Sequence, residues 1–206
     1  PEESTAHKNG DIHIHDMDFY TLTETCCQID IVKLFKGGFG TGHGFVREPN
    51  DIRTYAALGC IAIQANQNDQ HGGQSIPNFD YGMAIGVRKT YKKNYRTNFI
   101  KAYNLVVGGS MTEEDIKNKF SQMEKEGFVP TIANNEEYDK KERAIFSGLS
   151  DMDYNKIRAF ARKQSLSETD NATYQAMEAL VHNLNTMHSR AGAQVPFSSI
   201  NFGTDT

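Results

Sequence analysis

Two apolar segments that are typical of buried strands stand far apart in this sequence, with long helical patterns between them. Residues 26–35 read CCQIDIVKLF, mostly apolar with β-branched members, and residues 193–203 read AQVPFSSINFG. Strands that are separated by helices usually lie parallel in one sheet, because the helical crossover returns the chain to the same end. The order of these segments therefore predicts an α/β fold with parallel strands.

The region between these strands predicts a pair of long helices. We expect the first to begin with Asn50 as its N-cap and to bury Tyr55 and Leu58 on one face. The second covers about residues 78–107 and ends at a glycine pair. The stretch HGGQSIP, residues 71–77, interrupts the helical pattern. A short break of this kind predicts an antiparallel helix pair, which is a common dimer-forming element.

The remaining sequence gives weaker signals. Residues 37–44, GGFGTGHG, form a loop that either approaches a ligand closely or serves as a hairpin tip. Thr112 is expected to open a short charged helix, and residues 127–168 predict one or two short surface helices. We expect Asp170 to cap a last helix with one apolar stripe, formed by Tyr174, Met177, Val181, Leu184 and Met187.

The charge balance excludes several classes of protein. Lys and Arg number 22 against 26 Asp and Glu, a formal charge of −4, which argues against direct DNA binding or a grip on anionic membranes. No apolar run approaches the roughly 18–20 residues of a membrane span, and no leader pattern is present. We expect a cytoplasmic protein. Because the chain begins with Pro1 and stops within a strand-like run, we also expect it to be a portion of a longer one.

The three cysteines are Cys26, Cys27 and Cys60. Adjacent cysteines rarely bond to each other, because the ring strains the peptide unit, so we expect reduced thiols. Neighbouring side chains on a strand point to opposite faces, so at most one of Cys26 and Cys27 can face a site while the other packs into the core. Cys60 lies in a helix rich in small residues, where a packing role is expected.

His13 and His15 alternate with apolar residues on an extended segment, which places both imidazoles on one face. Asp16 and Asp18 follow directly and could supply oxygen ligands or support. This pattern is similar to a metallohydrolase ligand set, so a metal-dependent hydrolase is one interpretation. A packed or hydrogen-bonded polar cluster is the alternative.

Four segments, taken in order, resemble one known family. They are GDIHIHDMDFY, TCCQIDIVKLFKGGFGTGHG, QHGGQSIPNFDYGMA and TYQAMEALVHNLNTMHSRAGAQVPFSSINFGTDT. Together they closely resemble the anaerobic, class III ribonucleoside-triphosphate reductases, which are glycyl radical enzymes. The resemblance covers nearly the whole chain, and residues 128–168 are its least distinctive part.

The resemblance implies a fold for the chain. Residues 1–206 would be a portion of a single catalytic domain, a ten-stranded α/β barrel of the glycyl radical enzyme and ribonucleotide reductase type. Residues 26–35 and 194–203 would be its first two strands. The helix pair 51–69 and 79–105 would lie at a homodimer interface, near the site of dNTP and ATP effectors.

The resemblance also implies an oxygen-sensitive radical reaction. An activating enzyme, an iron–sulfur protein that uses S-adenosylmethionine, makes a glycyl radical that generates a thiyl radical on a loop cysteine. The thiyl radical removes the 3′ hydrogen of a ribonucleoside triphosphate. A strand cysteine then helps to expel the 2′ hydroxyl as water, with formate as the reductant, and the deoxynucleotide product serves DNA synthesis.

On this resemblance the strand cysteine is Cys26, with Cys27 as the alternative. The expected substrate contacts are His13, His15, Gln194, Pro196 and Ser198, and no metal site is expected in this chain. Val195, Phe197 and Ser199 occupy the other face of the last strand. Nothing in the sequence corresponds to the thiyl cysteine, the radical glycine or the structural zinc site of the family, so the chain is expected to be inactive alone.

Overall fold

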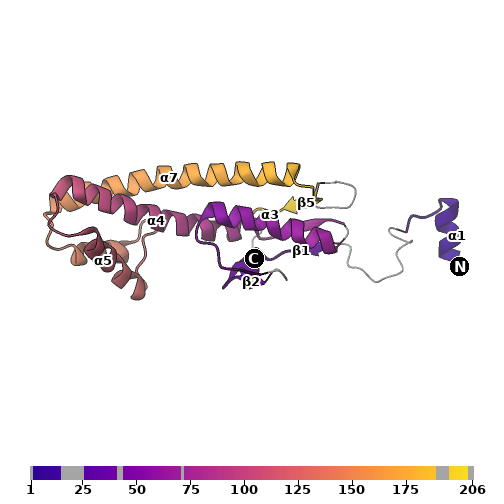
Figure 1. The fold of residues 1–206 in the computed structure, drawn as a ribbon, viewed down its shortest axis with the longest axis horizontal. Coiled ribbons are helices and arrows are strands. Elements are labelled where there is room, and N and C mark those ends of the chain that lie inside the picture. Colours follow the sequence, from indigo (N-terminus) through magenta and orange to yellow (C-terminus); the bar gives the residue numbers. More distant parts are fainter. Residues whose placement is uncertain (1, 15–25, 41–43, 71, 189–194, 204–206) are drawn as a thin grey trace.

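The computed structural model of the chain describes residues 2–14, 26–40, 44–70, 72–188 and 195–203. Long helices dominate the described part, and a small sheet lies beside them (Figure 1). Helices α3 (Ile52–Asp69), α4 (Phe79–Val107) and α7 (Asp151–Thr186) contact one another along their lengths. The mixture of helices with a parallel sheet agrees with the α/β class that the sequence predicts.

The sheet contains three parallel strands in the described residues, in the order β1 (Cys27–Gln28), β4 (Gln74–Ile76) and β5 (Ser198–Ile200). The prediction of parallel strands is therefore confirmed. The two expected strands do not pair with each other, because β4 lies between them. The sequence predicts only a break between two helices at β4, because three residues flanked by glycines and a proline carry little strand signal.

The prediction of one strand over residues 26–35 is wrong beyond Gln28, because residues Ile31–Phe35 form helix α2. The side chain of Asp30 caps this helix by accepting hydrogen bonds from the backbone N–H groups of Val32 and Lys33. Asn78 also donates to Asp30, at 2.7 Å, and this bond is the main reason that the pKa of Asp30 is lowered. The apolar run buries Ile31 and Phe35 through helical spacing instead. The last strand is likewise confined to Ser198–Ile200.

The glycine-rich stretch leads into a small antiparallel hairpin of β2 (Phe39–Gly40) and β3 (Phe45–Val46). Gly38 precedes β2 with a φ of +85°, and a Cβ atom there would lie 2.3 Å from the carbonyl oxygen of Val46. Only glycine combines this backbone conformation with so close an approach. The hairpin interpretation of this loop therefore fits the described residues.

The predicted antiparallel helix pair is confirmed as α3 and α4. The backbone N–H of Ile52, at the start of α3, donates to Oγ1 of Thr90 in α4, and a Cβ atom at Gly59, further along α3, would meet Met83 near the start of α4. The N-cap of α3 is Asp51, which accepts from the N–H of Thr54 at 2.9 Å, one residue later than the Asn50 that we predicted. Helix α4 ends at Gly108, whose φ of +70° is left-handed, as expected for a helix C-terminus.

Helix α7 differs most from the prediction. It begins after Ser150 and runs without interruption through Asp170, which is therefore not its N-cap. The expected apolar stripe is only partly correct: Met177 and Leu184 pack against a hydrophobic cluster, but Tyr174 is 68% and Val181 is 55% exposed, and Met187 is exposed too. The buried face of α7 includes two hydroxyl groups that accept hydrogen bonds from α4. Asn98 donates to Ser165 and Asn94 donates to Thr169, each at 3.1 Å. Apolar periodicity cannot reveal a helix contact that is made by hydrogen bonds.

Shorter helices complete the fold. Helix α5 (Glu113–Lys125) opens with the predicted Thr112, which forms a capping box with Asp115. Helix α6 (Glu136–Ile145) and the first part of α7 occupy the region where we predicted short surface helices. Helix α1 (Glu2–Asn9) lies at the N-terminal end. None of the helices in the described residues combines the length and the apolar composition needed to cross a membrane.

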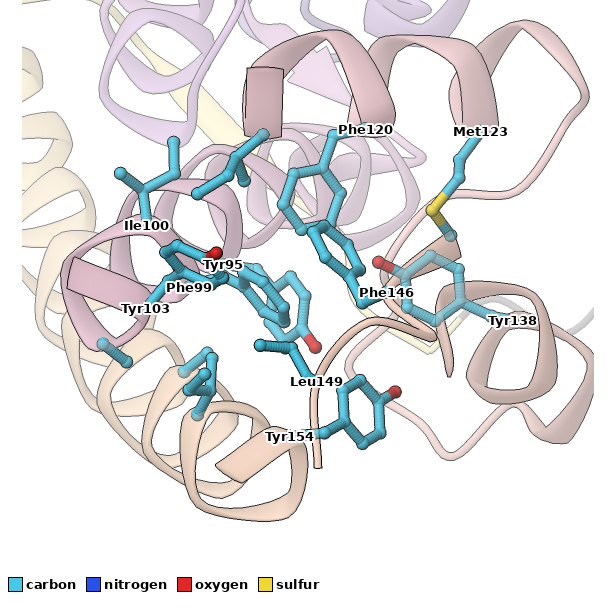
Figure 2. Packing of buried hydrophobic residues seen from close by; sticks show 14 of the residues in the cluster. Tyr95, Phe99, Ile100, Tyr103, Phe120, Met123, Tyr138, Phe146, Leu149 and Tyr154 are labelled. Atoms are coloured by element: carbon cyan, nitrogen blue, oxygen red, sulfur yellow. The ribbon is translucent and has the colours of Figure 1, made fainter. Parts of the chain in front are cut away.

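Two hydrophobic clusters hold the described structure together. One is aromatic and joins α4, α5, α6 and α7, with Tyr95, Phe99, Phe120 and Phe146 at its centre (Figure 2). The other joins α2, α3, β4 and the ends of α4 and α7. The second cluster supports one face of the sheet, because Ile76 of β4 belongs to it.

The aromatic cluster contains a fully buried carboxylate, Glu142 of α6. Its oxygens accept hydrogen bonds from the hydroxyl groups of Tyr95 of α4, Tyr138 of α6 and Tyr154 of α7, which are labelled in Figure 2. Burial raises the pKa of Glu142, while the three hydrogen bonds act in the opposite direction. The carboxylate therefore links three helices within one apolar core.

Candidate active site

The two adjacent cysteines lie at the start of β1, the strand at one edge of the described sheet. Cys26 is exposed and Cys27 is half-buried. The N–H of Cys27 donates to the carbonyl of Gly73 at 3.0 Å, and Cys27 is the register partner of Gln74 in β4. Hydrogen bonding to the segment that leads into β4 thus fixes the backbone of Cys27 relative to the middle strand.

A cavity of about 550 Å³ opens at this end of the sheet. Both cysteines line it, together with residues of all three strands and of the segments that precede them. These residues are Gln28, Gly73, Gln74, Ser75, Phe197, Ser198 and Ser199. The volume is within the range of small-ligand sites. No charged side chain is among the described residues that line it.

The register separates the two faces of the sheet. Gln74 and Ile76 are each only 1% exposed and face the core, and Cys27 and Ser198 occupy the same row as Gln74. Alternation places Gln28, Ser75 and Ser199 on the opposite, open face. Cys26, one residue before Cys27, belongs to the open face by the same rule.

The three substrate contacts predicted on the last strand do not share one exposed face in the described structure. Pro196 is buried, Ser198 shares the row of Cys27 and Gln74, and Gln194 lies outside the described residues. The register places Ser199 on the same face as Cys26, in the row of Gln28 and Ser75. The alternation of the last strand was visible in the sequence, but its pairing with β4 was not, so the choice of face could not be made there.

The predicted histidine pair can be described only in part. His13 is exposed and its ring centre lies 5.4 Å from that of His7, whose Nδ1 accepts a hydrogen bond from the N–H of Ile14. His15 and Asp16 lie outside the described residues. Within the described part of the chain, no group of three or more His, Cys, Asp or Glu side chains is arranged to hold a metal ion.

The sequence does not predict a cluster of buried and half-buried amides between the end of α3 and β4. Asn66 donates to the side-chain oxygens of Gln70, at 3.0 Å, and of Gln74, and Gln67 donates to the carbonyl of Gly72 at 2.7 Å. These bonds attach the end of α3 to β4 and so support the strand beside Cys27. The dense run of Asn and Gln in residues 64–74 was the available signal.

Cys60 has the packing role that was expected. It is 2% exposed, and its thiol donates to the carbonyl of Leu180 in α7 at 3.7 Å. Burial raises the pKa of this thiol to about 11. A thiol that is buried and almost fully protonated near neutral pH is a poor nucleophile.

The chain is similar in sequence to proteins of one family. The family model described as anaerobic ribonucleoside-triphosphate reductase matches residues 1–206. The anaerobic ribonucleoside-triphosphate reductase of Salmonella typhimurium is 23% identical over 203 residues, which cover 98% of this chain and 21% of that protein. The corresponding protein of Enterobacteria phage T4 is 28% identical over 125 residues, 59% of this chain and 21% of the relative.

The chain belongs to the anaerobic ribonucleoside-triphosphate reductase family, a family of enzymes. A third relative, the protein of the same name from Escherichia coli, is 31% identical over 94 residues, which are 45% of this chain and 13% of that protein. The chain spans about a fifth of the length of the first two relatives.

Proposed function

We propose that this chain forms part of the catalytic body of an oxygen-sensitive enzyme that reduces ribonucleoside triphosphates to 2′-deoxyribonucleoside triphosphates for DNA synthesis. The observation that carries the proposal is the position of Cys26, exposed on the open face of a parallel sheet and lining a cavity, in a chain that matches the reductase family over its full length. Because the chain spans about a fifth of its relatives, the activity is proposed for a reductase polypeptide of their length.

The role of Cys26 in this reaction is to supply a proton. Breaking the bond between C2′ and its hydroxyl releases water only if the departing oxygen is protonated, and a positioned thiol can act as a general acid. A glycyl radical, held outside this chain, supplies the unpaired electron that starts the reaction. Formate is the proposed reductant, and its oxidation to carbon dioxide provides the two electrons. Cys27 is half-buried, and by alternation its side chain would point to the face of β1 opposite that of Cys26.

The same proposal implies a barrel, a dimer interface and an effector site around this chain. The parallel strands would extend into the ten-stranded barrel, and the α3–α4 pair would lie at a homodimer interface. Effector dNTP or ATP would bind near this pair, where the exposed Arg88 and Lys93 have no ion pair within the described residues. The activating iron–sulfur enzyme, the structural zinc site and the thiyl cysteine lie outside this chain. The cytoplasm is the proposed compartment.

The test compares two serine variants in the reductase polypeptide that carries this segment. Cys26→Ser should abolish deoxynucleotide formation and leave the glycyl radical detectable by electron paramagnetic resonance. Cys27→Ser is the matched control and should retain most of the activity, because its side chain would point to the face opposite that of Cys26. Normal product yield from Cys26→Ser would overturn the assignment of this residue, and loss of activity only in Cys27→Ser would transfer the role to Cys27.

A further inference from the structure

Three polar side chains form one row across the open face of the sheet. Gln28 of β1, Ser75 of β4 and Ser199 of β5 are register partners, so they stand side by side at intervals of about 4.8 Å, the usual strand spacing. Cys26 precedes Gln28 by two residues, so its thiol lies on the same face at a distance of about 6.6 Å along the strand. All four residues line the 550 Å³ cavity.

The side chains of this row are accessible and unpaired within the described residues. Gln28 and Ser199 are exposed and Ser75 is half-buried. Within the described residues, none of these three side chains makes a hydrogen bond. On the other face Gln74 differs, because it is 1% exposed and its amide oxygen accepts from Asn66, whereas Ser198 in the same row is exposed. An unpaired polar row beside an exposed thiol is a surface suited to a hydrogen-bonding ligand.

The chemistry of the row limits what it can bind. An amide and two hydroxyls can donate and accept hydrogen bonds but carry no charge. Triphosphates are recognised through Arg, Lys or helix N-termini, and no charged side chain lines the cavity among the described residues. Neutral hydroxyl groups on adjacent carbons are the matching partner, because each one both donates and accepts.

We propose that Gln28, Ser75 and Ser199 bind the sugar hydroxyl groups of the substrate and hold the ribose over the thiol of Cys26. This inference rests on the proposed function and adds the part of the substrate that this face contacts. The row is about 10 Å long, which suits a furanose ring with its hydroxyls. The phosphates would then be held by groups outside the row.

Two nucleosides that differ only in their sugar hydroxyls test the proposal in the reductase polypeptide. Adenosine should bind more tightly than 2′,3′-dideoxyadenosine in isothermal titration calorimetry, and Gln28→Leu or Ser199→Ala should reduce this difference by about 3- to 10-fold, the effect of one lost hydrogen bond. Ser199→Thr keeps the hydroxyl and should keep the preference. Gln122→Leu and Ser121→Ala, both on the exposed face of α5, are the matched controls and should change nothing.

The turnover assay separates this inference from the proposed function. In an active reductase, Gln28→Leu should raise KM for the ribonucleotide by about 3- to 10-fold while the glycyl radical signal stays unchanged. Unchanged KM and kcat in both variants of an active enzyme would overturn the inference alone. If the wild-type polypeptide forms no deoxynucleotide, the proposed function fails, but the nucleoside titration still tests whether the polar row binds the sugar. Equal affinity for the two nucleosides would refute this inference. An affinity difference that depends on Gln28 would support it.

Discussion

The hydroxyl of Tyr138 donates a hydrogen bond of 2.6 Å to Oε2 of Glu142, inside a core where Glu142 is fully buried. Tyr95 and Tyr154 donate to the other oxygen at 2.9 Å each. Tyr95 belongs to α4 and Tyr154 to α7, so one carboxylate connects both long helices to α6. Buried charge of this kind is costly unless all of its partners are present.

Removing the carboxylate should therefore destabilise the chain. Glu142→Ala leaves three buried hydroxyl groups without their acceptor and opens a void, and we expect the free energy of unfolding to fall by about 3 kcal/mol in urea titrations. Glu142→Gln preserves the shape and one acceptor and should cost about 1 kcal/mol. The control is Glu137→Ala, an exposed position on the same helix, and it should change little. Equal stability of the Glu142→Ala variant and the wild type would contradict this account of the core.

The raised pKa of Glu142 predicts the sign of a pH effect. Because the folded state holds the proton more tightly than the unfolded chain, whose carboxyl has a pKa near 4.5, this group favours folding most at low pH. Its contribution is lost as the pH rises through the folded-state pKa. We expect the difference in unfolding free energy between wild type and Glu142→Gln to decrease from pH 4.5 upward, as measured by urea unfolding at several pH values.

Glu124 should show a pH effect of the opposite sign to that of Glu142. Hydrogen bonds from Lys92 and Arg96 lower the pKa of its carboxyl. Its contribution should therefore be present above the unfolded pKa and be lost as the pH falls through the lower folded-state value. A Glu124→Gln series with the same slope as the Glu142→Gln series would show that neither residue sets the pH dependence in this way.

Two helix glycines should respond in opposite ways to the same substitution. A Cβ atom at Gly86 would lie 2.9 Å from the ring of Tyr55 and 3.1 Å from Cα of Ile52, whereas one at Gly59 would meet only the end of Met83 at 3.5 Å. Gly86→Ala should destabilise the chain by about 1–3 kcal/mol despite better helix propensity. Gly59→Ala should stabilise it by about 0.5–1 kcal/mol. Thermal unfolding measures the stability of both variants. A Gly86→Ala variant more stable than the wild type would refute the close packing of α3 on α4.

The three thiols should react at different rates. Cys26 is exposed, Cys27 is half-buried and Cys60 is buried, with a pKa of about 11. At pH 8 only about one Cys60 thiol in a thousand is ionised, and the thiolate is the reactive form. Brief treatment of the folded chain with iodoacetamide should therefore label Cys26 first and Cys60 last, as read by mass spectrometry of the peptides. Faster labelling of Cys27 than of Cys26 would reverse the faces that the register assigns.

The sequence carried enough information for the elements whose ends are marked locally. Gly108 ends α4 through its left-handed conformation, and Thr112 caps α5 through its own side chain. Apolar periodicity placed α3 and α4 within a residue or two. The parallel orientation of the strands also followed from their separation by helices.

The remaining features depend on contacts between distant segments. Strand β4 has only three residues and is defined by its neighbours on both sides, so no local signal specifies it. The continuous course of α7 depends on Ser165 and Thr169, whose burial is satisfied by asparagines of α4. Glu142 lies in a polar stretch, and its burial requires tyrosines from three parts of the chain. The open face of the sheet could be recognised only after β4 had fixed the register.

Helix α4 contributes to both hydrophobic clusters, with Phe79 and Met83 in the one beside the sheet and Tyr95 and Phe99 in the aromatic one. Its 29 residues span about 43 Å at 1.5 Å per residue. A tilt of one degree about its first turn would therefore move its far end by about 0.7 Å. Helix α4 thus connects the sheet that carries the two cysteines with the core that contains Glu142, and a rigid tilt at one end would displace the other.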